Sequence, residues 1–205
     1  MIVIVDYGMG NLFSIQSALH YLGAQSSISS DPQVIRNADK LILPGVGSFY
    51  KAMSNLKTAN LDEVVKEPVI NKKTPILGIC LGMQLLGSSS TEDGFSYGLG
   101  LIDSPVERFS ENEFVNLKIP HVGFDTVTIT HENKLFDGLD SSADFYFTHS
   151  YRMAFADQPY AVGICSHGEE FIAAFEKGHI CGTQFHPEKS QTNGLLLLKN
   201  FIEKF

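Results

Sequence analysis

The sequence predicts an α/β fold, in which a mixed, largely parallel sheet is flanked by helices and carries an antiparallel extension. In the first half of the chain, short apolar runs alternate with amphipathic helical patterns, which is typical of parallel strands joined by crossover helices. Beyond about residue 88, strand-like runs follow one another across tight turns, which favours antiparallel pairing. No linker-like stretch separates the two parts, so we expect a single domain over residues 1–205.

The first half is expected to hold three buried strands and the helices that connect them. Leu12, Ile15 and Leu19 recur at helical spacing, and Gly23 ends the first helix. The strands are predicted at Ile2–Asp6, Lys40–Leu43 and Pro75–Ile79. The helices are predicted at Asn11–Leu22, from the capping sequence Ser30-Asp31-Pro32, near Ser48–Leu56, over Leu61–Asn71 and over Leu81–Leu86.

The second half begins with a polar loop at Ser88–Gly94 and ends with a helix at Gly194–Phe205 that is expected to pack on the sheet. Between them, short apolar runs separated by Gly, Asn or Asp predict further strands. These runs are Val106–Phe109, Phe114–Ile119, Thr126–Thr130, Phe145–Phe147, Ala161–Ile164, Phe171–Glu176 and Ile180–Phe185.

The composition excludes several classes of protein. With 43% hydrophobic and 19% charged residues the chain can bury a core, so it is not a disordered protein. Its formal net charge is -8 and its basic residues are scattered, so we expect no nucleic-acid partner. No apolar run is long enough to cross a bilayer and no secretory signal is apparent, so we expect a cytoplasmic protein without a membrane partner.

Cys80 is the candidate nucleophile. The stretch Gly78-Ile79-Cys80-Leu81-Gly82 places it between a buried strand and a helix, in the arrangement of a nucleophile elbow. Such a turn strains the backbone of the nucleophile and requires glycines beside it, while the helix N-terminus favours a thiolate. A buried structural cysteine is the common alternative, and we assign that role to Cys165 and Cys181, which lie in plain strand-like runs. Three widely spaced cysteines form neither a disulfide framework nor a Cys-x-x-Cys metal site.

His186 is the candidate base, and Glu188 is the candidate group that orients it. A thiolate nucleophile works with an imidazole, which a carboxylate or amide in turn holds in place. Pro187 favours an extended backbone at His186, so the side chains of His186 and Glu188 are expected on one side of the chain. His121 and His149 also follow strand-like runs, which makes them candidates for lining a site.

The oxyanion of an acyl-transfer reaction needs hydrogen-bond donors. The backbone N–H of Leu81 is one candidate, and the glycine loop Pro44–Phe49 after the second strand is another. Parallel strands present their carboxyl ends at one edge of a sheet, so this loop is expected near the elbow. An ordinary strand-to-helix turn is the alternative interpretation of the loop.

Three motifs together resemble the class I, triad-type glutamine amidotransferases. They are Leu43-Pro44-Gly45-Val46-Gly47, Gly78-Ile79-Cys80-Leu81-Gly82-Met83-Gln84 and His186-Pro187-Glu188. The stretches Asp6–Leu12 and Thr148–Tyr151 resemble, more narrowly, the glutaminase subunits of imidazole glycerol phosphate synthases of histidine biosynthesis. The resemblance covers nearly the whole chain and implies the amidotransferase fold.

The resemblance also implies roles for individual residues. Cys80 would be the nucleophile, His186 the general base and then acid, and Glu188 the group that holds His186. Gly47 and Leu81 would supply oxyanion N–H groups, with a loop rearrangement at Gly47 in some members. Residues that would line the glutamine pocket are Gly82, Gln84, Glu92, His149, Ser150 and Tyr151, with Glu92 near the substrate ammonium. Asn11, Phe124 and Lys189 would face a (β/α)-barrel cyclase in a heterodimer, and the chemistry would need no metal or organic cofactor.

One segment departs from the resemblance and suggests an alternative function, and two further hypotheses also remain open. The family usually has Pro-His-Met-Gly-Trp-Asn where this chain has Pro120-His121-Val122-Gly123-Phe124-Asp125, so a related subunit that supplies ammonia for amidating a surface-polysaccharide sugar is an alternative. Another Cys-elbow hydrolase of the same fold is a second alternative, although a His usually follows the Cys closely there. A nucleotide-binding module is weakly indicated, because Gly8–Phe13 holds only two glycines of the dinucleotide fingerprint.

Overall fold

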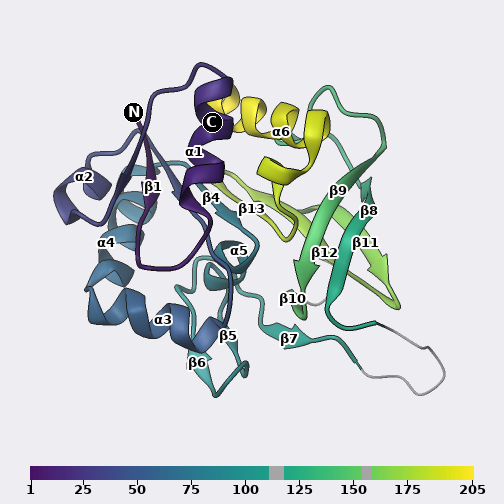
Figure 1. The fold of residues 1–205 in the computed structure, drawn as a ribbon, viewed down its shortest axis with the longest axis horizontal. Helices are drawn as coiled ribbons and strands as arrows, with labels where there is room; N and C mark the ends of the chain where they lie inside the picture. The colour runs from purple at the N-terminus through teal and green to yellow at the C-terminus, as the bar shows by residue number, and fades with distance from the viewer. Residues whose placement is uncertain (111–117, 154–157) are drawn as a thin grey trace.

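The fold is built on one large sheet with helices on both faces (Figure 1). The computed structural model describes residues 1–110, 118–153 and 158–205. Nine strands form the sheet in the order β2-β1-β3-β4-β13-β12-β11-β8-β9. Their bounds are β1 Ile2–Val5, β2 Ser26–Ser29, β3 Lys40–Leu43, β4 Ile76–Ile79, β8 His121–Ile129, β9 Ser142–His149, β11 Ala161–His167, β12 Glu169–Lys177 and β13 Ile180–Thr183.

The sheet divides into a parallel half and an antiparallel half, which confirms the predicted fold class. Strands β2, β1, β3, β4 and β13 pair in parallel. Strands β12, β11, β8 and β9 pair antiparallel and extend the same sheet. Strand β13 therefore lies at the seam, parallel to β4 on one side and antiparallel to β12 on the other.

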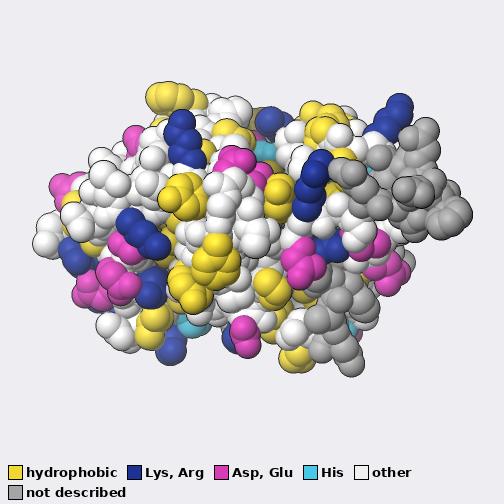
Figure 2. Space-filling model, turned by 90° about the horizontal axis from the view of Figure 1, so that it is seen from below, with side chains coloured by type: hydrophobic (Ala, Val, Ile, Leu, Met, Phe, Trp, Pro, Cys, Tyr) yellow, Lys and Arg dark blue, Asp and Glu magenta, His cyan; other side chains and the backbone are white. Residues whose placement is uncertain are grey.

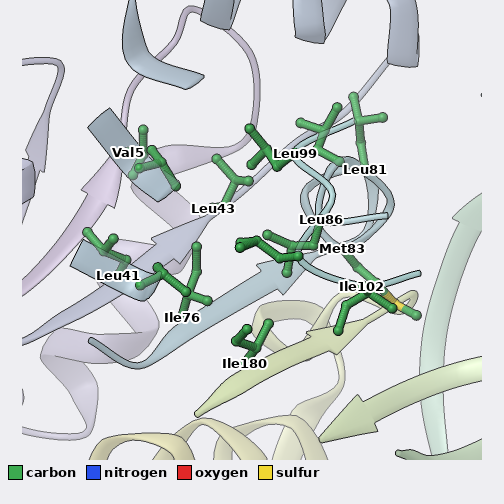
Figure 3. Packing of buried hydrophobic residues seen from close by; sticks show 14 of the residues in the cluster. Val5, Leu41, Leu43, Ile76, Leu81, Met83, Leu86, Leu99, Ile102 and Ile180 are labelled. Atoms are coloured by element: carbon green, nitrogen blue, oxygen red, sulfur yellow. The ribbon is translucent and has the colours of Figure 1, made fainter. Parts of the chain in front are cut away.

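Helices cover both faces of the sheet, and the sheet divides the hydrophobic core into two clusters. Ile15 and Leu19 of α1 and Leu197 and Phe201 of α6 belong to one cluster. The other cluster joins α3, α4 and α5 to the opposite face of the strands; Figure 3 shows Leu81, Met83 and Leu86 against side chains from β1, β3, β4 and β13. The helices are α1 Leu12–Tyr21, α2 Pro32–Arg36, α3 Phe49–Thr58, α4 Leu61–Glu67, α5 Leu81–Leu85 and α6 Gln191–Lys204.

Several local predictions need correction. The helix expected over Leu61–Asn71 divides into α4 and a π-helical turn at Pro68–Lys72, because Pro68 has no N–H to continue the α-helical bonding. Strand β2 was not predicted, because its sequence Ser-Ser-Ile-Ser lacks a continuous apolar run. The predicted strand at Phe114–Ile119 lies largely outside the described residues.

A small second sheet was not predicted as a sheet, although one of its strands falls within the run Val106–Phe109, which was predicted as a strand. It contains β10 (Tyr151–Met153), β7 (Val106–Arg108), β5 (Ser89–Ser90) and β6 (Ser96–Tyr97), in that order. Strand β5 falls inside the stretch that was expected to be a polar loop. Strands of two residues, such as β5 and β6, are too short to show an alternating pattern in the sequence. This sheet lies below the carboxyl ends of the parallel strands in Figure 1.

Charged side chains of both signs are exposed on the face of the molecule seen in Figure 2. Lys and Arg side chains are scattered there among Asp and Glu side chains, and hydrophobic side chains gather near the middle. Among the described residues, no helix is long and apolar enough to span a membrane.

Two glycines allow α5 to pack closely against the sheet. A Cβ atom built on Gly82 would lie 1.8 Å from the carbonyl oxygen of Leu43 on β3. A Cβ atom on Gly78 would lie 2.7 Å from backbone atoms of Gly82 and Met83. Only hydrogen fits at these two positions, so any larger residue separates α5 from β3 or β4.

We therefore expect Gly82→Ala to lower the free energy of unfolding by about 3 kcal/mol or more, because backbone atoms must move to admit the methyl group. Gly178→Ala is the matched control: Gly178 has φ +64° but nothing within 4 Å of its Cβ position, so only backbone strain of about 1 kcal/mol is expected. Urea unfolding of the two variants measures the difference, and equal losses would contradict the packing argument.

Candidate active site

Cys80 occupies the bend between β4 and α5. Its backbone has φ 54° and ψ -112°, and residues other than glycine rarely adopt such a positive φ. Its N–H donates to the carbonyl of Thr183 at 2.7 Å, which ties the bend to the end of β13. The strained strand-to-helix turn predicted for a nucleophile elbow is present, and the sulfur lies at the carboxyl edge of the parallel strands.

His186 and Glu188 meet just beyond β13. Nδ1 of His186 lies 2.8 Å from Oε1 of Glu188, and the two side chains are 2% and 1% exposed. His186 is extended, as expected, but Pro187–Lys189 form a 3₁₀ turn. The contact therefore arises because this turn folds Glu188 back onto the imidazole, and not because both residues lie on one strand.

The imidazole of His186 also interacts with Cys80. Burial lowers the pKa of His186, but hydrogen bonds and charges of Cys80 and Glu188 outweigh it and raise the pKa from 6.5 to about 10. Nε2 of His186 is buried and has no hydrogen-bond partner among the described residues. The ring is thus held by Glu188 at Nδ1, which leaves Nε2 without a hydrogen bond.

Two buried glutamines adjoin the sulfur. Nε2 of Gln184 lies 3.8 Å from Sγ of Cys80, and Oε1 of Gln184 accepts from Gln84 at 3.0 Å. Gln84 also donates to the carbonyl of Tyr151 at 2.7 Å, so its amide links the elbow to β10 of the small second sheet. Gln184 was not predicted; its position two residues before His186, inside an otherwise apolar strand end, is the signal that identifies it.

A cavity of about 280 Å³ opens at Cys80, at the small end of the range for ligand sites. Its lining includes predicted residues that lie far apart in the sequence: Gly47 and Tyr151 are separated by 104 positions. Both halves of the sheet contribute to the lining. The lining residues are Val46, Gly47, Cys80, Leu81, Gln84, Glu92, Thr148, His149, Ser150 and Tyr151. Gly82, which was also predicted to line the pocket, is not among them, because it packs against Leu43.

Glu92 supplies the carboxylate of the cavity. Its Oε2 accepts from the N–H of Phe49, the first residue of α3, at 2.8 Å. Burial raises the pKa of Glu92 above its usual value, although this hydrogen bond acts in the opposite direction. The carboxylate is fixed at a helix N-terminus, where negative charge is stabilised, and it is placed to attract a cationic group of a ligand.

His149 is anchored at both ring nitrogens. Nδ1 lies 2.9 Å from the carbonyl of Tyr151, and Nε2 lies 3.0 Å from Nδ1 of His121. Nε2 of His121 in turn lies 3.2 Å from Oδ2 of Asp125. Burial lowers the pKa of His149 to about 3 and that of His121 to about 4, so both rings are neutral at pH 7.

The residues expected at a partner interface lie on the surface. Asn11 is exposed before α1, and Phe124 is 51% exposed on β8. The ring of Phe124 packs edge-on against Tyr146, and Nζ of Lys189 lies over the same tyrosine ring at 5.7 Å. Phe124, Tyr146 and Lys189 thus form one surface cluster.

The sequence of this chain is similar to those of known glutamine amidotransferases. The family model for class-I glutamine amidotransferases matches residues 3–205. An imidazole glycerol phosphate synthase subunit HisH of Campylobacter jejuni is 46% identical over 202 residues, 98% of this chain and 99% of that protein. The corresponding subunit of Sulfurimonas denitrificans is 48% identical over 204 residues, 99% of this chain and 98% of that protein.

Solved structures agree on the fold. A crystal structure of a glutamine amidotransferase superposes with a TM-score of 0.76 at 19% identity, covering 99% of this chain and 98% of that chain. The PurLQS structure from Thermotoga maritima has a TM-score of 0.72 at 17% identity and covers 98% of this chain and 96% of that chain. At these identities the likeness concerns the fold alone.

The buried, neutral His149 makes stability depend on pH. Below pH 6.5 the unfolded chain protonates this residue whereas the folded chain, with a pKa of about 3, does not, so the unfolded state binds more protons and stability falls as pH falls. Between pH 6.5 and 5 we expect His149 to contribute a loss of about 2 kcal/mol. In His149→Gln, urea unfolding should show a shallower dependence over this range, whereas exposed His20→Gln should keep the original slope. An unchanged slope in His149→Gln would contradict the assignment.

Proposed function

The chain belongs to the class I glutamine amidotransferases, and we propose that it is the glutaminase subunit of an imidazole glycerol phosphate synthase in histidine biosynthesis. The observation that supports the chemistry is the contact among three side chains: Cys80 lines the small cavity, and His186, which is held by Glu188, interacts with Cys80. The proposal of histidine biosynthesis rests on the relatives described above, because they match this chain over almost their entire length.

The reaction begins with attack of the Cys80 thiolate on the side-chain carboxamide of glutamine. The imidazolium of His186, held by Glu188, protonates the leaving nitrogen, and ammonia departs as the thioester forms. Water that has lost a proton to His186 then hydrolyses the thioester and releases glutamate. The raised pKa of His186 suits it to store the proton between the two steps.

The oxyanion of the tetrahedral intermediate is stabilised by backbone N–H groups. Leu81 and Gly47 both line the cavity, and Gly47 has φ +102°, which a glycine adopts readily. Leu81 is fixed by the elbow and the start of α5. Gly47 lies in a loop between β3 and α3, so its N–H can turn toward the oxyanion when the loop moves.

Glutamine is held by the remaining lining residues. The Glu92 carboxylate pairs with the substrate ammonium, and the segment His149–Tyr151 forms the opposite wall. Gln84 joins the two walls through its bond to Tyr151 and keeps their separation constant.

Ammonia passes directly to a partner subunit. Free ammonia is largely protonated at neutral pH and is then not a nucleophile. The partner is a (β/α)-barrel cyclase in a heterodimer, docked over Asn11, Phe124 and Lys189. The three cysteines are free thiols, which suits the reducing cytoplasm in which we place the protein.

Replacing the nucleophile tests the chemistry. Cys80→Ser should lower glutamate release from glutamine by at least about a thousandfold, because the thioester can no longer form. Cys181→Ala, at a buried cysteine of β13, should retain activity of the same order. A glutamine-analogue diazo-ketone should label Cys80 in the wild-type chain, as read by peptide mass spectrometry. Labelling of Cys165 or Cys181 with Cys80 untouched would overturn the assignment.

Addition of a barrel cyclase subunit should raise glutamine turnover above that of the isolated chain. Lys189→Glu should weaken the heterodimer by at least about tenfold, because it reverses a charge at the proposed interface. Exposed Lys199→Glu, on α6, is the matched control and should bind as the wild type does. Full turnover by the isolated chain, or equal affinity of the two variants, would contradict the coupling.

A further inference from the structure

We propose that His121, Asp125 and His167 form a binding site for a divalent transition-metal ion of the Zn²⁺ class. His121 and Asp125 lie on β8, and His167 ends the neighbouring strand β11 (Figure 1). One ligand atom from each of the three residues lies within 4.8 Å of the other two. None of the three lines the cavity at Cys80, so the site is separate from the glutaminase chemistry.

Among the described residues, no donor satisfies one lone pair of His121. Nδ1 of His149 faces the carbonyl of Tyr151, so it carries the hydrogen and Nε2 of the neutral ring accepts. Nδ1 of His121 must then donate to His149, which leaves Nε2 of His121 unprotonated. This nitrogen lies 3.2 Å from Oδ2 of Asp125, which is also an acceptor. Two acceptors at this distance call for a cation between them.

His167 adds a third acceptor. Its Nε2 lies 2.9 Å from the carbonyl of Lys118 and therefore donates, so Nδ1 is the nitrogen of this ring that can coordinate a metal. Two imidazoles and one carboxylate are the ligand set that Zn²⁺ and its first-row neighbours prefer, whereas Mg²⁺ and Ca²⁺ prefer oxygen ligands alone.

Metal binding needs a small local rearrangement. The rings of His121 and His167 stack with centroids 4.0 Å apart and planes at 17°, so they cannot yet point at one ion. Zinc bonds of about 2.1 Å bring ligand atoms to about 3.5 Å from each other, so the His167 ring must turn and close by about 1 Å. His167 is half-buried and the Asp125 side chain is 37% exposed, which leaves both room for the turn and a path for the ion.

The bound ion would be connected to the cavity through His149. A metal on Nε2 of His121 fixes the hydrogen on Nδ1, and this hydrogen is donated to His149, whose ring lines the cavity. Hydrogen bonds of this kind orient metal-bound histidines. Metal binding therefore needs the same tautomers that the carbonyl of Tyr151 already imposes along this path.

Titration with Zn²⁺ tests the proposal. The full chain is used in a Cys80→Ser background, since the catalytic thiol would itself compete for zinc. Isothermal calorimetry should show one equivalent bound, and His167→Gln and Asp125→Asn should each weaken binding by at least about tenfold. His131→Gln, an exposed histidine outside the cluster, is the matched control and should bind normally. Co²⁺ should give visible absorption bands that disappear in His167→Gln.

Absence of stoichiometric binding, or equal affinity in all the variants, overturns the proposal and indicates that the acceptors share only a proton. Thermal melts establish that each variant folds; if His167→Gln does not, the comparison of half-exposed Asp125→Asn with His131→Gln decides. The assay never measures glutamine hydrolysis, so its failure is distinguishable from failure of the proposed function.

Discussion

The close approach of α5 to the sheet at Cys80 is the constraint on which the site depends. The bend holds a non-glycine residue at positive φ, which costs on the order of 1–3 kcal/mol and must be offset by surrounding contacts. Gly78 and Gly82 make the approach possible, and the apolar side chains of α5 bury themselves against β3 and β4 (Figure 3). The sulfur is therefore presented by a rigid element rather than by a mobile loop.

The seam of the sheet explains why the proposed catalytic groups meet. Strand β13 pairs in parallel with β4, with Thr183 opposite Ile79, so both strands deliver their next residues to the same edge. Cys80 follows one strand and Gln184 follows the other, with His186 two residues further on. The antiparallel half begins at the same seam and folds back so that the end of β9 supplies His149 as the opposite wall.

Two histidines of the site experience opposite environments. His186 lies between a carboxylate and a thiol, which together raise its pKa despite burial. His149 has no acidic partner at either nitrogen, so burial dominates and lowers its pKa. Opposite shifts of this kind separate a proton carrier from a neutral hydrogen-bonding group. One residue type thus provides two functions, and the difference arises from the neighbours that the fold supplies.

The sequence by itself determined the strands β1, β3 and β4 of the parallel half and the bend at Cys80, because apolar runs and flanking glycines are local signals, and the His-Pro-Glu motif predicted the triad. It did not reveal β2 or the short strands β5, β6 and β10, whose sequences carry no period of their own, and Gln184 was overlooked although it lies two residues before His186. The 3₁₀ turn that brings Glu188 to His186, and the chain of contacts from Asp125 through His121 to His149, were decided only by the tertiary structure. These contacts join residues on different strands, and pairing between strands depends on register and burial, which no local pattern encodes.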